Sequence, residues 1–376
     1  MYFKTIPEHQ YIKQRLVHLA TRGQVSHAYL FWGAAGSAQL ALALAVATYL
    51  HCQHRLPEDA CGQCRSCLKM HKGIHPDTQF LFPMATAQQT SKEAPSADLT
   101  GAWRSFLQTH AYGHLQDWML HAGSTAKQPL ILTEQARQVH PYLSLTPVES
   151  SYKIVLIWLP EHLHLTAANT LLKVLEEPPK QTLFLLVSAA PDKILTTIRS
   201  RAHALYVPTF SDASVASLLQ QQYSDLSAPQ INTLVALADG DVGTALRLAN
   251  DEGSDDLKAF ITWMRMCYKQ DVTHLVDRAE AYQQLTKEKQ KHFFLYALHM
   301  LRCVLITWFG HETLHRATPA ELDFNRRFST SLTYPQVRSY ASWFQASYNY
   351  LDRNVNPRLL FLDVSLRVSR AFQPNV

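Results

Sequence analysis

The chain has 376 residues, of which 47% are hydrophobic and 17% are charged. This length and composition predict roughly two or three folded domains and exclude a protein that is disordered as a whole. The formal net charge of +5 permits contact with nucleic acid. However, the basic residues are spread along the chain, whereas a dedicated DNA-binding protein concentrates them.

Residues 1–16 carry charged and polar side chains throughout, where a signal peptide would need an apolar stretch. No run of about 18 apolar residues, the length that crosses a bilayer, occurs in the sequence. We therefore expect a cytoplasmic protein with no membrane contact.

The first chemical motif is a glycine-containing loop between an apolar run at residues 28–32, which predicts a buried strand, and a helix of Ala, Leu and Val at residues 40–50. The loop residues that matter are Gly33, Gly36, Ala38, Gln39 and Leu40. The last three stand where a phosphate loop of pattern GxxxxGK[ST] has its glycine, its phosphate-neutralising lysine and its magnesium-binding hydroxyl. The loop thus predicts that the chain keeps the fold of a nucleotide-binding protein but does not hydrolyse a nucleotide. The alternative is that these residues form an ordinary strand-to-helix turn.

Four of the six cysteines form a cluster with the spacing C-x8-C-x2-C-x2-C. They are Cys52, Cys61, Cys64 and Cys67. Two CxxC steps direct three thiolates towards one point, and the longer loop brings the fourth thiolate to the same point. Four thiolates in this arrangement predict a zinc ion. The ion would be structural, because four protein ligands leave no coordination position open for catalysis. Disulfides, unligated thiols and an iron-sulfur cluster are the alternatives.

The following Arg65, Lys69 and Lys72 are interpreted as a solvated basic face, with a DNA contact as the alternative.

The middle of the chain combines a polar segment with further strands. Residues 83–100 are rich in Ala, Ser, Thr and Gln and predict a flexible surface insertion, whereas residues 101–121 look helical. Residues 152–158 predict a second buried strand. In nucleotide hydrolases such a strand ends in two acids, but here Trp158 is followed by leucine and proline. Glu161, farther on, is interpreted as a capping or surface acid, with a metal-activating role as the alternative.

The segment after residue 165 predicts an amphipathic helix with Thr166 as its N-cap, ended by two prolines. Strands are predicted at residues 182–187 and 203–207, and three short helices at residues 211–250. Beyond residue 251, helices are predicted at 257–268, 289–309, 334–351 and 357–372, the last with Asn356 as its cap.

Several blocks occur together in one order. They are SHAYLFWG at 26–33, the four cysteines with HPD at 75–77, LSLTP at 143–147, AANTLLKVLEEPP at 167–179 and Arg-Ser-Arg at 199–201. This set strongly resembles the clamp-loader branch of the AAA+ proteins, and most closely the delta prime subunits of bacterial DNA polymerase III. The block at 167–179 is specific to this branch.

The resemblance implies a subunit that does not hydrolyse ATP itself. Delta prime subunits commonly lack the lysine, hydroxyl and acids of the ATP site, and Gly243 stands here where active relatives carry a phosphate-sensing arginine. Ser200-Arg201 matches the motif that presents an arginine finger to ATP on the neighbouring subunit. A helix-capping surface arginine is the alternative for Arg201, and Arg199 fits the motif less well by register.

The resemblance also implies an α/β architecture: a RecA-like AAA+ domain with a parallel sheet at 1–208, a helical lid at 209–252 and an all-α collar at 253–376 that mediates oligomerisation. The AAA+ domain would embed a zinc module at about 52–67 and the insertion at about 83–100. Expected partners are ATPase subunits of the gamma/tau type, a delta-like subunit and, through the complex, the sliding clamp and primed DNA. The chain would be a component of the DNA polymerase holoenzyme. An ATP-hydrolysing loader subunit and a zinc-dependent DNA-binding protein are the alternatives.

Overall fold

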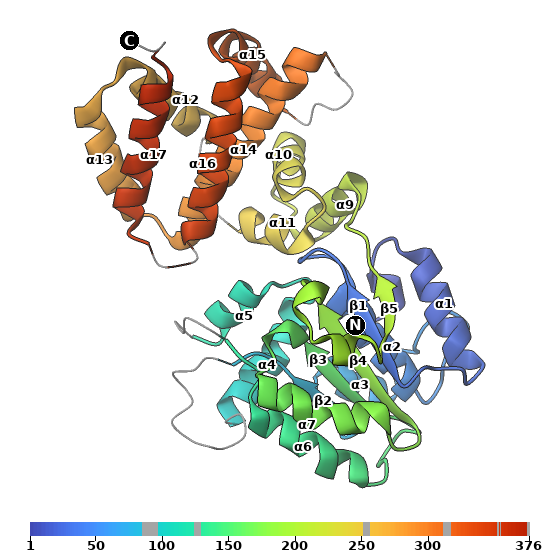
Figure 1. Ribbon diagram of the computed structural model, residues 1–376. Helices are drawn as coiled ribbons and strands as arrows, with labels where there is room; N and C mark the ends of the chain where they lie inside the picture. Colours follow the sequence, from blue (N-terminus) through green and yellow to red (C-terminus); the bar gives the residue numbers. More distant parts are fainter. Residues whose placement is uncertain are drawn as a thin grey trace. The chain divides into compact units, whose positions relative to one another are not determined.

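The structure is a computed structural model that describes residues 1–84, 97–123, 129–250, 256–310, 317–351, 353 and 355–373. It divides into two compact units (Figure 1). The amino-terminal unit comprises residues 1–214 together with 240–243, and the carboxy-terminal unit comprises residues 215–239 and 244–376.

The amino-terminal unit is built around a parallel sheet of five strands in the order β2-β3-β4-β1-β5. The strands are β1 (Ala28–Trp32), β2 (Thr78–Leu81), β3 (Lys153–Trp158), β4 (Thr182–Ser188) and β5 (His203–Tyr206). Every residue of β3 and β4 is buried, which is why both read as continuous apolar runs. All four strands predicted from the sequence are confirmed to within one residue at each end.

Helices cover both faces of this sheet. On one face α6 (Thr133–Ser144) and α7 (Leu165–Glu176) bury their apolar sides against β1, β3 and β4 (Figure 1). On the other face α2 (Gln39–His51) contacts the same three strands and is buried over its whole length. The remaining helices of this unit are α1 (Gln10–Thr21), α3 (Arg65–His71), α4 (Ala97–Thr109), α5 (Leu115–His121) and α8 (Thr196–Arg199). This arrangement confirms the expected α/β class.

Two local details differ from the sequence-based expectations. Helix α7 begins at Leu165 with His164 as its N-cap, because the imidazole Nδ1 of His164 accepts a hydrogen bond from the amide of Thr166 at 3.3 Å. The prediction that Thr166 caps the helix is therefore wrong. Residues 85–96 of the predicted insertion lie outside the described residues, and residues 97–100 form the first turn of α4.

The carboxy-terminal unit is helical throughout its described residues. Its helices are α9 (Asp212–Gln222) and α11 (Val242–Ala249), which both begin in the amino-terminal unit, α10 (Ala228–Ala238), α12 (Asp256–Lys269), α13 (Val272–Gln283), α14 (Lys287–Phe309), α15 (Pro319–Phe328), α16 (Tyr334–Leu351) and α17 (Pro357–Ala371). The sequence missed α13 and α15. Its capping prediction for α17 is confirmed, since Asn356 Oδ1 accepts hydrogen bonds from the amides of Arg358 and Leu359. The division into a lid and a collar stays a prediction.

Helix α14 is the core of this unit. Phe294, Ala297 and Val304 are fully buried among α12, α15 and α16. By length and composition alone, Lys289–Phe309 passes as a candidate membrane span within the described residues, with a mean hydropathy of 1.4. A buried core helix passes the same test, and the packing of α14 fits that explanation.

Candidate functional site

The glycine-containing loop of residues 33–38 lies between β1 and α2, at the carboxyl end of the central strands, where α/β sheets bind their ligands. Gly33 packs so closely on the backbone just after β5 that an added Cβ would lie 2.1 Å from the carbonyl oxygen of Val207. Gln39, in the position of the usual lysine, donates from Nε2 to the carbonyl of Ala34 at 2.6 Å. The neutral side-chain amide of Gln39 therefore bonds back to the loop backbone, and residues 33–40 include no lysine or arginine.

Two other segments pack directly on Gly36, which has a φ of +74°. A Cβ at Gly36 would lie 1.7 Å from Oδ1 of Asp241 and 2.7 Å from Nε2 of His114. These two side chains bond to each other at 3.0 Å, and the amide of Val242 donates to the carbonyl of Gly36 at 3.1 Å. The space beside the loop is thus filled by residues of the chain itself.

Gly243 lies close to His114 and Asp241 as well. A Cβ at Gly243 would lie 2.3 Å from the carbonyl oxygen of Tyr112 and 3.2 Å from Nε2 of His114. An arginine at this position would need the segment between α4 and α5 to move away. The sequence-based prediction that Gly243 replaces an arginine stays a prediction, and the structure shows which residues surround this glycine.

Aromatic side chains fill the end of β3 where hydrolases carry acids. The ring of Trp158 lies 5.2 Å from that of Trp103 and 5.6 Å from that of Phe106. Trp118 of α5 adds an edge contact with Trp103 and donates from its indole to the carbonyl of Pro83 at 2.7 Å. Residues 101–121, for which the sequence assigned no role, thus fold as two helices that seal this end of the sheet.

One carboxylate oxygen of Glu161 bonds to the backbone after β4. Its Oε1 accepts hydrogen bonds from the amides of Ala189 and Ala190, at 3.0 and 3.1 Å. It fixes the turn that follows β4, which fits the structural interpretation made from the sequence.

The four cysteines of the predicted zinc module converge. The Sγ atoms of Cys52, Cys61, Cys64 and Cys67 all lie within 4.8 Å of one another. In a tetrahedral zinc site with Zn–S bonds of about 2.3 Å, the sulfur atoms would be about 3.8 Å apart, and Cys61 and Cys67 lie at 4.0 Å. The donor set therefore fits a closed structural metal site.

Backbone amides prepare these thiols for metal binding. The amide of Cys61 donates to Sγ of Cys52 at 3.3 Å, that of Cys64 to Cys61 at 3.4 Å and that of Cys67 to Cys64 at 3.4 Å. Hydrogen bonds from the amides of Gln63 and Cys64 lower the pKa of Cys61 to about 6. Amide donors favour the thiolate form that a metal ion requires, whereas burial raises the pKa of the Cys52 and Cys67 thiols.

Two buried carboxylates near the cysteine module accept hydrogen bonds from backbone amides of other segments. Asp59 accepts hydrogen bonds from the amides of Phe3 and Lys4, which ties the start of the chain to the cysteine module. Asp77, the acid of the HPD block, is fully buried. It accepts three amide hydrogen bonds of 2.7–2.9 Å from residues 148–150. The HPD block thus has a structural explanation that the sequence did not provide.

Arg201 lies just beyond α8 with its guanidinium at the surface. Nη1 donates to the carbonyl of Thr197 at 2.6 Å, and Nη2 pairs with Oε1 of Glu176 at 2.5 Å. The side chain is 32% exposed, so it is oriented by the protein yet reachable from outside. Arg199 instead pairs with Asp192 at 3.1 Å.

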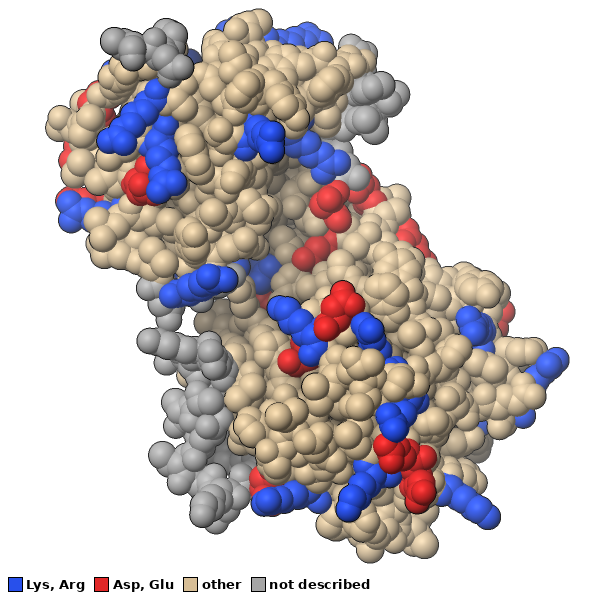
Figure 2. Space-filling view, in the orientation of Figure 1, with Lys and Arg blue, Asp and Glu red and all other residues tan. Residues whose placement is uncertain are grey.

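Basic residues do not gather into one patch on the face in view: Figure 2 shows Lys and Arg scattered there, with Asp and Glu among them. On α3, Lys69 pairs with Glu149, while Arg65 and Lys72 are exposed. This distribution fits the solvated-face interpretation, and the DNA contact stays an untested alternative.

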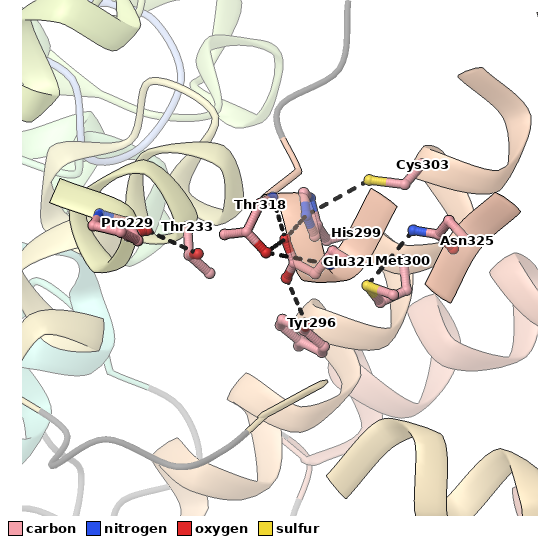
Figure 3. A network of polar contacts seen from close by, with 9 residues as sticks. All are labelled: Pro229, Thr233, Tyr296, His299, Met300, Cys303, Thr318, Glu321 and Asn325. Carbon is pink, nitrogen blue, oxygen red and sulfur yellow. Dashed lines mark hydrogen bonds and ion pairs between the residues drawn. The ribbon is translucent and has the colours of Figure 1, made fainter. Parts of the chain in front are cut away.

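The carboxy-terminal unit contains a buried polar network that the sequence did not reveal (Figure 3). The Glu321 carboxylate accepts from the hydroxyl of Tyr296 at 2.5 Å and from the amide of Thr318 at 2.7 Å, and it lies 3.9 Å from Nε2 of His299. Cys303 lies 3.6 Å from the same imidazole. Burial raises the pKa of Cys303 to about 12, so this thiol is protonated and is not a nucleophile.

A family model described as DNA polymerase III, delta subunit, matches residues 8–211, more than half of the chain. The chain belongs to this family. The protein named DNA polymerase III subunit delta' of Pseudomonas aeruginosa is 29% identical over 254 residues, which are 68% of this chain and 65% of that protein. The protein of the same name from Yersinia pestis is 30% identical over 218 residues, which are 57% of this chain and 52% of that protein.

These findings confirm the resemblance seen in the motifs, although the chain spans only 52–65% of the length of these two relatives. Among solved structures, a gamma subunit-related protein of Thermotoga maritima aligns with 97% of this chain and 100% of its own, at 13% identity and a TM-score of 0.41. That similarity is too weak to add to the family assignment.

Proposed function

We propose that this chain is a delta prime-like subunit of a bacterial clamp loader that does not hydrolyse ATP and assists neighbouring ATPase subunits. The observation that carries the proposal is a contrast between two sites. The chain's own phosphate loop is packed against Asp241 and His114, whereas Arg201 is oriented and accessible at the surface.

In this role Arg201 would act in trans. A guanidinium placed against the γ-phosphate of a neighbour's ATP stabilises the charge that spreads over the phosphoryl oxygens in the transition state. The contacts of Arg201 with Glu176 and Thr197 restrict the side chain before the partner arrives, so less conformational entropy is lost on engagement.

The partners in this proposal are gamma/tau-like ATPase subunits and a delta-like subunit, with the sliding clamp and primed DNA engaged through the complex. The helices beyond residue 253 would form the oligomerisation collar, and the complex would work in the cytoplasm at the replication fork. Cys52, Cys61, Cys64 and Cys67 would hold a structural zinc ion that fastens the loop before α3.

The test is an Arg201→Ala variant reconstituted into the loader with its partner subunits. We expect clamp loading and DNA-stimulated ATP hydrolysis to fall at least tenfold while the complex still assembles, because arginine fingers contribute roughly 10³ to 10⁵ in rate elsewhere. Arg199→Ala, which removes a neighbouring exposed arginine, is the matched control and should leave both rates unchanged. Equal rates for wild type and Arg201→Ala would reject the finger. ATP turnover by the isolated chain would instead favour a hydrolysing subunit.

A further inference from the structure

The helix that follows the phosphate loop begins without a cap of its own. Its N-cap position is Ala38, which has no side-chain acceptor, and every residue of α2 is buried. The hydroxyl of Ser37, on a residue only 2% exposed, has no hydrogen-bond partner among the described residues. The first N–H groups of a helix need acceptors, and the positive end of the helix dipole favours an anion there.

A carboxylate of the chain itself lies beside Gly36, three residues before α2 begins. Oδ1 of Asp241 lies against Gly36 and bonds to Nε2 of His114 at 3.0 Å. The side chains of His114 and Asp241 are only 15% and 24% exposed. His114 is itself fixed, because its amide donates to Asp117 at 2.6 Å in the capping box of α5.

Glycine is required at both points where the segments meet. A Cβ at Gly36 would overlap the carboxylate of Asp241, and a Cβ at Gly243 would overlap the carbonyl of Tyr112. The amide of Val242 then joins the two segments by its bond to the carbonyl of Gly36. Backbone and side-chain contacts thus connect the loop to the segment before α5 and to the start of α11.

We propose that the loop is an anion-binding site whose ligand is built into the chain: the Asp241 carboxylate, oriented by His114, occupies the place beside Gly36 that a phosphate group would take. It fastens the loop to residues 240–243 without a nucleotide. This inference rests on the proposed non-hydrolysing function and adds to it the group that replaces the nucleotide.

The test compares Asp241→Ala with wild type as the full-length chain, using inorganic pyrophosphate as the probe. Removing the carboxylate should free the space beside Gly36 for an anion, so calorimetry should find pyrophosphate bound at least tenfold more tightly by the variant than by wild type. Asp192→Ala removes an acid that is 93% exposed and pairs with Arg199, and it should behave as wild type.

Hydrogen exchange provides a second measurement that does not depend on the probe. Amides of residues 34–41 should exchange at least tenfold faster in Asp241→Ala and also in the milder His114→Ala, but not in Asp192→Ala. The proposal requires both the gain in pyrophosphate binding and the faster exchange, and the lack of either overturns it. Because these experiments use the isolated chain, their failure is distinguishable from a failure of the Arg201 test in the loader.

Discussion

Replacing Glu321 by glutamine should make the carboxy-terminal unit less stable by an amount that depends on pH. Burial by itself would raise the pKa of this carboxyl, since the residue is only 2% exposed. Hydrogen bonds from the Tyr296 hydroxyl and the Thr318 amide, together with the His299 imidazole 3.9 Å away, outweigh burial and lower the pKa from 4.5 to about 2. That difference corresponds to about 3 kcal/mol of folding free energy.

The sign of the effect follows from which state binds the proton more tightly. The pKa is lower in the folded chain than in the unfolded chain, so the carboxylate stabilises the fold above pH 4.5, and this contribution is lost as the pH falls towards 2. Glutamine keeps the shape but has no charge to titrate. The stability difference between wild type and Glu321→Gln should thus be about 3 kcal/mol near pH 7 and approach zero near pH 2.

Urea unfolding followed by helical circular dichroism from pH 2 to pH 7 would measure this difference. Asp323→Asn on the same helix is the matched control, because the Asp323 side chain is 70% exposed and pairs with Arg327 in an i,i+4 contact, which is worth a few tenths of a kcal/mol. A difference between wild type and Glu321→Gln that is constant with pH, or no larger than that of the control, would refute the reasoning.

Two further predictions concern the amino-terminal unit. Purified protein should contain one zinc ion per chain, and chelation or Cys67→Ser should lower the thermal midpoint of this unit, because closed zinc sites contribute directly to folding; native protein without zinc by metal analysis would contradict this. Trp103→Ala should cost about 3–5 kcal/mol, because Trp103 is 1% exposed at the centre of the aromatic cluster. Leu120→Ala, at a site 69% exposed, is the control, and equal urea midpoints for the two variants would show that the cluster is not a cooperative core.

Elements with a continuous local residue pattern were predictable from the sequence. The strand at residues 153–158 and the helix after the phosphate loop were predictable because both are fully buried, so that their apolar runs are unbroken. The four cysteines were predictable as a cluster because their spacing alone brings them together. Helices α13 and α15 were missed, since their exposed faces dilute the apolar pattern.

The contacts around the phosphate loop could not be predicted in the same way. Gly36, His114 and Asp241 are far apart in the chain, and no local periodicity links an aspartate at the start of α11 to a histidine before α5. The same holds for Glu321, whose partner Tyr296 lies 25 residues earlier on another helix.

By itself, the sequence determined the family, the parallel sheet and the convergence of the cysteines, because each depends on residue type and spacing within one segment. Only the tertiary structure decided which side chains surround the loop and the end of β3. It places a carboxylate beside Gly36 and aromatic rings at the end of β3. Such packing depends on segments from distant parts of the chain meeting in space, which the pattern along any one of them does not encode.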